Sequence, residues 1–227
     1  MFFFPVGCLL LGLFILFLPV ILVLVFLNVV AFSFSRLGMS PGVAVTMLFM
    51  MLAGSVINIP LTRRTVVYSR EMQFGWFRIP VRQESGLAIN LGGAVIPAAI
   101  SIYLLFKAPL PPILASTVLM IIICKFLAKP IPGRGLGMPM FIPPVLATLF
   151  AVLLAGEMAA PVAYISGVLG TLIGGDLLNL SKARKLGAGV VSIGGAGVFD
   201  GIFLVGIFSV VLTALYLPTT PIQMPVY

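Results

Sequence analysis

Two aspartates, Asp176 and Asp200, are the residues of this sequence whose setting most strongly indicates chemistry. They are its only aspartates, and both lie in otherwise apolar, glycine-rich stretches, GTLIGGDLLNL and GGAGVFDGIFL. An ionisable group inside a membrane segment costs a few kcal/mol to insert, so such groups are usually kept for a function. Two carboxyl groups in contact share a proton, so that one activates a water while the other protonates a departing group.

The composition places these aspartates in a membrane protein. The chain is 61% hydrophobic and 8% charged, whereas about a quarter of the residues of a globular protein are charged. Its long apolar runs predict helices rather than a β-barrel. The absence of histidine excludes Ser-His and Cys-His catalysis and most zinc and haem sites. Cys8 and Cys124 show no motif spacing, so we expect buried thiols, no metal site and no cofactor.

Seven apolar stretches predict an all-α, polytopic helix bundle that forms a single transmembrane domain over residues 1–227. The predicted spans cover residues 6–32, 41–60, 87–106, 110–128, 139–156, 160–180 and 198–217. Of the 13 basic residues, all but Arg36 and Lys107 fall in loops on one side. The positive-inside rule therefore predicts a multi-pass protein of the cell membrane with a cytoplasmic N-terminus. Residues 61–86 alternate apolar and polar side chains and predict a short cytoplasmic β-hairpin.

This topology puts the two aspartates at similar depth. Asp176 falls near the cytoplasmic end of the sixth span and Asp200 near the start of the seventh, both within about 6 Å of the same surface at 1.5 Å per residue. Neighbouring glycines such as Gly175 and Gly197 let helices approach closely. The pair is therefore a candidate catalytic dyad. A transport or ion site stays open, as does a structural role in which Asp176 pairs with Lys182 or Arg184 and Asp200 caps the seventh helix.

Three asparagines fall near the same predicted surface. Asn58, Asn90 and Asn179 lie near the cytoplasmic ends of their spans, and together with Gly175 and Gly197 they are candidate pocket-lining residues. The stretches INIP and NLGGAVIP combine Asn, Gly and Pro, which favours broken helices of the kind that build substrate sites in transporters. The alternative is a set of interhelical amide hydrogen bonds, each contributing about 1 kcal/mol or less.

Two family resemblances follow from these residues. The stretches VSIGGAGVFDGIFLVG, INIPL and AINLGGAVIP resemble the uncharacterised prokaryotic membrane proteins grouped as the domain-of-unknown-function family numbered 1614. This likeness spans most of the chain and implies a protein of the prokaryotic cytoplasmic membrane. A more distant likeness is to the GxGD intramembrane aspartyl proteases, which use one aspartate on one helix and a second in Gly-x-Gly-Asp on another. Asp176 and Asp200 match that pair, although Ile173-Gly174-Gly175-Asp176 lacks the first glycine of the motif.

The resemblance and the paired carboxylates together favour an intramembrane aspartyl protease-like hydrolase with Asp176 and Asp200 as catalytic residues. A small-solute or ion-coupled membrane transporter is the first alternative, and a non-catalytic membrane assembly factor is the second. The expected partners are membrane lipid and either a transmembrane peptide or a small solute. Nucleic acid is not expected, because the basic residues are spread over short loops that face anionic lipid.

Overall fold

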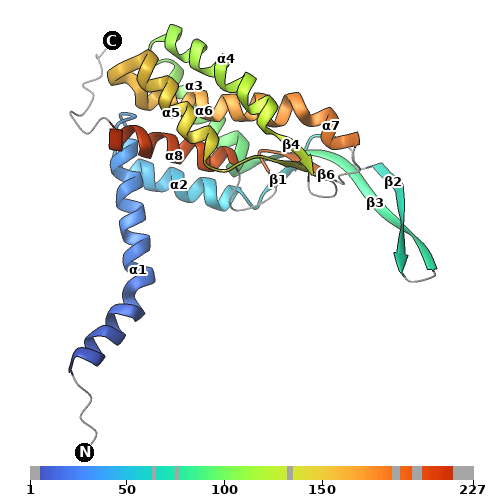
Figure 1. Ribbon diagram of the computed structural model, residues 1–227, viewed down its shortest axis with the longest axis horizontal. Helices are drawn as coiled ribbons and strands as arrows, with labels where there is room; N and C mark the ends of the chain where they lie inside the picture. The colour runs from blue at the N-terminus through green and yellow to red at the C-terminus, as the bar shows by residue number, and fades with distance from the viewer. Residues whose placement is uncertain are drawn as a thin grey trace, which may run out of the picture.

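The computed structural model describes residues 6–62, 65–74, 77–131, 135–185, 190–195 and 201–216. Within these ranges the chain forms a helical bundle with a small sheet at one end, and helix α1 (Val6–Ser35) projects away from the bundle (Figure 1). α1 is apolar up to Leu27, and most of its side chains between Leu10 and Phe26 are exposed, which suits contact with lipid. Its last turns pack against α2 and α8, where Val30 and Phe34 are buried.

Proline begins most helices of the bundle. It occupies one of the first two positions of four helices: α2 (Pro41–Gly54), α3 (Ile96–Leu105), α4 (Leu110–Leu127) and α5 (Ile142–Ala155). Proline is favoured there because its fixed φ suits a helix and its missing N–H has no partner in the first turn. The remaining helices are α6 (Ala159–Gly170), α7 (Leu180–Lys185) and α8 (Gly201–Tyr216).

The membrane-type character predicted from composition is confirmed in part. Three helical stretches are long and apolar enough to cross a membrane: Leu10–Ser35, Leu110–Leu127 and Ile142–Ala183. Three further apolar helical stretches are shorter: Pro41–Gly54, Leu91–Leu105 and Leu204–Tyr216. The described chain is therefore mostly helical, with three stretches that meet the length needed to span a bilayer.

The all-α prediction is wrong where strand replaces helix. The span predicted over residues 41–60 ends at Gly54, and β1 (Asn58–Pro60) follows it. The span predicted over residues 87–106 is extended up to Asn90 and helical only from Leu91. In both places the backbone hydrogen bonds go to a neighbouring strand, so the local apolar sequence did not decide the element.

The sheet is organised around one long strand, β3 (Phe77–Asn90). β1 and β2 (Thr65–Phe74) pair with it in antiparallel fashion, and β6 (Val190–Ile193) pairs with it in parallel. The predicted hairpin over residues 61–86 is thus confirmed as β2 and β3 (Figure 1). A separate two-stranded ladder joins β4 (Lys129–Ile131) and β5 (Gly135–Gly137).

Helix α6 lies at the centre of the bundle. Its residues from Ala159 to Val168 are all buried, and it contacts α4, α5 and α8. Small residues make this packing possible, since a side chain at Gly167 would meet Val205 of α8 and one at Gly170 would meet Met120 of α4. α6 thereby fixes the position of the segment that follows it, residues 171–176.

Candidate functional site

Two short π-helical segments define the site. One, Leu91–Val95, joins β3 to α3, and the other, Thr171–Asp176, continues α6. A π-helical turn is wider than an α-helical turn and is often found at functional sites. Both segments contain adjacent glycines, and the second ends on Asp176.

Gly194 connects the two π-helical segments. It follows β6 with a φ of +81°, a conformation that residues with a Cβ rarely adopt. A Cβ here would lie 2.5 Å from the Ala94 Cβ and 2.9 Å from the Gly93 carbonyl carbon, so Gly194 packs against the first segment. Its N–H donates a hydrogen bond of 2.7 Å to the Asp176 Oδ2, at the end of the second. Only glycine permits both contacts.

Asp176 is a half-buried carboxyl with no charged partner among the described side chains. Its one hydrogen bond to a described residue is the bond from Gly194, and it makes no capping bond to the helical turn that begins at Leu177. The predicted alternative of a pair with Lys182 is wrong in this structure, because the Lys182 Nζ donates to the Asn179 Oδ1 instead, at 3.1 Å. The carboxyl is therefore positioned by backbone and has no described cation beside it.

Asn179 holds the second π-helical segment to the end of α4. It is fully buried, and its Nδ2 donates to the carbonyls of Gly174, Gly175 and Lys125 at 3.0, 3.2 and 3.1 Å. Widening of the helix leaves carbonyls without their usual partners, and a side-chain amide supplies the missing donor. The role that the structure shows for Asn179 is therefore to fasten backbone.

Asn90 fastens the backbone of the first π-helical segment in a similar way. It is fully buried and caps this segment, accepting a 2.6 Å bond from the Gly93 N–H. Its Nδ2 donates to the Ser55 carbonyl at 2.6 Å and to the Asn58 Oδ1 at 3.1 Å. The predicted amide hydrogen bonds are thus present at Asn58 and Asn90, although they join strands rather than helices.

Side-chain hydrogen bonds connect β1, β3 and β6 next to the first π-helical segment. The Asn58 Oδ1 accepts from Asn90 on β3 and also from the Ser192 Oγ on β6, at 2.6 Å. Asn58 is exposed, and its Nδ2 donates to none of the described residues. Ser192 and β6 were not predicted, although the run Val190-Val191-Ser192-Ile193 before two glycines carries a recognisable strand signal.

The structure places the predicted site residues in two connected groups. Asp176, Gly175 and Asn179 lie in and after the second π-helical segment, whereas Asn58 and Asn90 lie on the sheet. Gly175 packs against Met138, whose terminal methyl would be 2.8 Å from a Cβ at this position. The other two predicted residues, Gly197 and Asp200, lie outside the described residues.

The chemistry available here is that of a carboxyl group rather than of a metal cluster. Among the described residues, no three His, Cys, Asp or Glu side chains lie close enough to hold a metal ion. Asp176 accepts a hydrogen bond through one oxygen and leaves the other for a proton, a water or a cation. Cys124 is buried, as predicted, and its Sγ lies 3.7 Å from the Thr171 Oγ1.

Comparison with known proteins adds a family. Residues 52–212 match the family described as "Protein of unknown function (DUF1614)". The matched stretch contains the whole described sheet, both π-helical segments and Asp176. No curated protein and no solved structure matches the chain.

Proposed function

This chain belongs to the DUF1614 family, and we propose that it is an integral membrane hydrolase that cleaves peptides near the membrane surface. In this proposal Asp176 and Asp200 form the acid–base pair. The observation that carries it is the setting of Asp176, a half-buried carboxyl held by the Gly194 N–H with no cation beside it among the described side chains. A carboxyl group kept in an apolar protein without a neutralising partner is a candidate for proton transfer.

The position of Asp200 in the chain supports its assignment as the second carboxyl. It comes six residues after Gly194 (194 to 200) and directly before Gly201, the first residue of α8. α8 packs along α6, with Val205 against Gly167, and α6 leads into the segment that ends at Asp176. The described segments that precede and follow Asp200, β6 with Gly194 and α8, thus both contact the segment that ends at Asp176.

The proposed reaction is hydrolysis of an amide bond. The ionised carboxylate takes a proton from a water as the water oxygen bonds to the peptide carbonyl carbon. The protonated partner then gives its proton to the amide nitrogen as the carbon–nitrogen bond breaks. The two carboxyl groups exchange protonation states during one turnover, and later proton exchange with water restores them.

The sheet supports an extended peptide as the substrate. Among the described strands β6 has a neighbour on one edge only, which is β3. An extended peptide adds to a free strand edge through main-chain hydrogen bonds, with little demand on its sequence. Because β6 leads directly to Gly194, a peptide added there would approach the Asp176 carboxyl.

We also propose that all seven predicted apolar stretches enter the prokaryotic cytoplasmic membrane, with the N-terminus and the β2–β3 hairpin in the cytoplasm. The distribution of basic residues supports this orientation. At about 1.5 Å per residue, the 14-residue α2 rises about 21 Å. A helix shorter than the bilayer core is accommodated by local thinning of the bilayer.

The test is cleavage of single-span, quenched-fluorescence peptides by the full chain in liposomes. Asp176→Asn and Asp200→Asn should each abolish cleavage, whereas Glu157→Gln, which alters an exposed acid in the α5–α6 turn, should leave it unchanged. Asparagine keeps the shape of the side chain and removes its acid–base chemistry. Wild-type cleavage rates in either aspartate variant would refute the dyad.

A small-solute or ion-coupled transporter is the second candidate, and the two π-helical segments favour it. Both replace regular α-helix in apolar sequence, the first between β3 and α3 and the second after α6, and discontinuous helices build the substrate sites of many transporters. Asp176 would then bind a proton or cation, and the free amide donors of Asn58 would face the path. Flux that follows an imposed pH or ion gradient and is lost in Asp176→Asn, without peptide cleavage, would select transport. Aspartate variants that change stability alone would select a non-catalytic assembly factor.

A further inference from the structure

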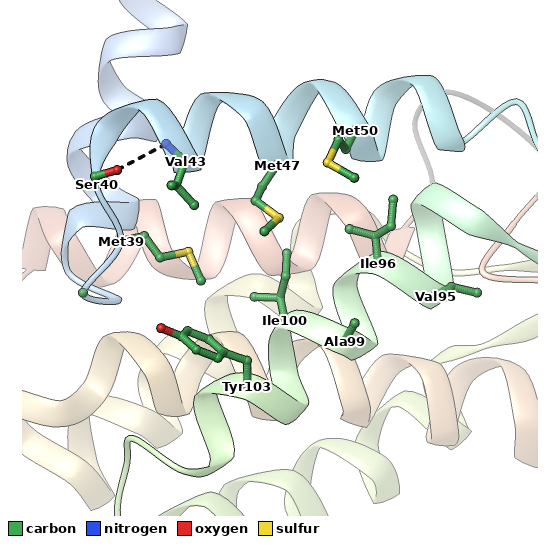
Figure 2. A pocket seen from close by; sticks show the side chains of 11 residues that line it. Met39, Ser40, Val43, Met47, Met50, Val95, Ile96, Ala99, Ile100 and Tyr103 are labelled. Carbon is green, nitrogen blue, oxygen red and sulfur yellow. Dashed lines mark hydrogen bonds between the residues drawn. The ribbon is translucent and has the colours of Figure 1, made fainter. Parts of the chain in front are cut away.

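A cavity of about 520 Å³ lies between α2 and α3, away from the Asp176 site. It is lined by Gly38, Met39 and Ser40 of the α1–α2 turn, by Val43, Met47 and Met50 of α2, and by Val95, Ile96, Ala99, Ile100 and Tyr103 on the facing elements. Figure 2 shows the methionine side chains of α2 and its preceding turn opposite Ile96, Ile100 and Tyr103. The volume lies within the range of about 300–1,000 Å³ that is typical of small-molecule sites.

The lining is apolar and adaptable over most of its length. Met39, Met47 and Met50 have flexible, unbranched side chains that fit the shape of a varied apolar ligand. α2 and α3 are among the shorter apolar helices, and many of their other side chains are exposed where a membrane protein contacts lipid. An apolar cavity in that setting is filled by the most abundant apolar molecule present, which is a lipid chain.

One end of the cavity carries positive charge. The Lys107 Nζ lies 4.5 Å from the centroid of the Tyr103 ring, which forms part of the cavity wall. Lys107 is one of the two basic residues that the predicted topology assigns to the outer side, so it would meet lipid head groups of the outer leaflet. The other, Arg36, is buried over the Phe32 ring and takes no part in the proposal.

A hydroxyl group accompanies this charge. Tyr103 is half-exposed, and its hydroxyl donates to none of the described residues. A phosphate group is an acceptor that suits an ammonium and a hydroxyl donor together.

We propose that this cavity binds an anionic phospholipid, with one acyl chain along the methionine-lined wall and the phosphate at Lys107 and Tyr103. The proposal is independent of the hydrolase assignment, because Lys107, Tyr103 and the methionines make no contact with Asp176; Val95, the last residue of the first π-helical segment, is the one lining residue that also belongs to the candidate site. The apolar wall would bind any acyl chain, whereas Lys107 selects the head group. A zwitterionic lipid with the same chains should therefore bind more weakly.

The experiment is native mass spectrometry of the full chain in detergent, titrated with phosphatidylglycerol or with phosphatidylcholine of identical acyl chains. We expect saturable binding of one phosphatidylglycerol molecule and weaker binding of phosphatidylcholine. Lys107→Gln should reduce the affinity for phosphatidylglycerol about fivefold, since one basic residue contributes about that much near an anionic surface. The loss should be smaller for phosphatidylcholine, whose phosphate is offset by its own choline cation. Lys125→Gln is the matched control, because the Lys125 Nζ also lies over a ring, that of Phe126, at 6.0 Å, but borders no part of this cavity.

A second pair of variants tests the chain-binding wall. Ala99→Phe places a ring in the cavity and should abolish the saturable site for both lipids, whereas Ala53→Phe, on an exposed position of α2 outside the cavity, should not. Circular dichroism of each variant checks that it has folded. Equal affinity for the two lipids, equal effects of the two lysine variants, or saturable binding that survives Ala99→Phe would each overturn the proposal.

Discussion

Replacing Gly194 by alanine should disturb the structure in two separable ways. The φ of +81° costs a residue with a Cβ about 1–2 kcal/mol. The added Cβ would also lie 2.5 Å from the Ala94 Cβ and 2.8 Å from the Ala94 backbone nitrogen, in packed structure that cannot move freely. Overpacking of this kind costs about 1–3 kcal/mol, so we expect a total loss of about 2–5 kcal/mol.

Gly156→Ala provides the matched control for this prediction. Gly156 also has a positive φ, +54°, but a Cβ there would meet nothing within 4 Å. Gly156→Ala therefore imposes a positive φ on alanine, here with a ψ of −117°, without any collision with the first π-helical segment. Reversible unfolding of both variants in mixed micelles, followed by far-ultraviolet circular dichroism, separates the two contributions. The reasoning is refuted if Gly194→Ala destabilises the protein no more than Gly156→Ala does.

A double variant tests whether Gly194 acts through Asp176. A shift of the Gly194 backbone weakens its N–H bond to the carboxyl, and a hydrogen bond to a charged group contributes about 1.5–3 kcal/mol. Once Asp176→Ala has removed the acceptor, Gly194→Ala should cost less than it does in the wild-type chain. Strict additivity of the two changes would show that the bond contributes nothing to stability.

Three further predictions concern the groups that hold the two π-helical segments. Asn90→Ala leaves buried backbone groups without partners and should cost about 2–4 kcal/mol in the same unfolding assay. Asn90→Asp should recover none of that loss, because it sets a buried carboxyl oxygen against the Ser55 carbonyl that now accepts from Asn90. Asn179→Ala removes the donor to three carbonyls, so amide hydrogen exchange over residues 171–176 should become faster. Exchange in α6, which precedes this segment, should stay the same. Gly92→Ala would bring a Cβ against the backbone at the end of α2 and should cost more than about 1 kcal/mol in thermal unfolding. Gly42→Ala is the control: Gly42 lies in α2 itself, where a Cβ meets open space, so this change should be neutral or stabilising by about 0.5 kcal/mol.

The helices were largely predictable from the sequence, and the reason is local. Proline, glycine and the length of the apolar runs mark the ends of α4 and α5 within a few residues of the predicted spans. The sheet was not predictable beyond its hairpin, because the decisive interactions are distant. β6 carries a short strand signal of four residues, but that signal does not identify its partner, which is the segment 86–89, about a hundred positions earlier.

The unusual setting of Asp176 was predictable from the sequence, whereas its contacts were not. Asp176 can be singled out from the sequence alone, because a carboxyl group in an apolar membrane segment costs free energy to insert. Which donor it meets depends on the turn after β6, and Lys182 is directed to Asn179 by side-chain geometry that no spacing reveals. The juxtaposition of Asp176 with Asp200 stays a prediction, because Asp200 lies outside the described residues.

The hydrogen bond from Gly194 to Asp176 gives a way to separate chemistry from structure. If the carboxyl served only to accept the Gly194 N–H, an asparagine would do so equally well through its own oxygen. It would also avoid the cost of a charge in apolar surroundings, about 2.5–3.5 kcal/mol at the centre of a membrane helix. The presence of a carboxyl group at this position is therefore better explained by proton transfer than by the hydrogen bond that it accepts. We therefore expect Asp176→Asn to unfold within about 1 kcal/mol of the wild-type chain in the micelle assay while it loses activity. A large loss of stability in Asp176→Asn would instead show that the ionised form holds the turn after β6, and the case for an acid–base role would then fail.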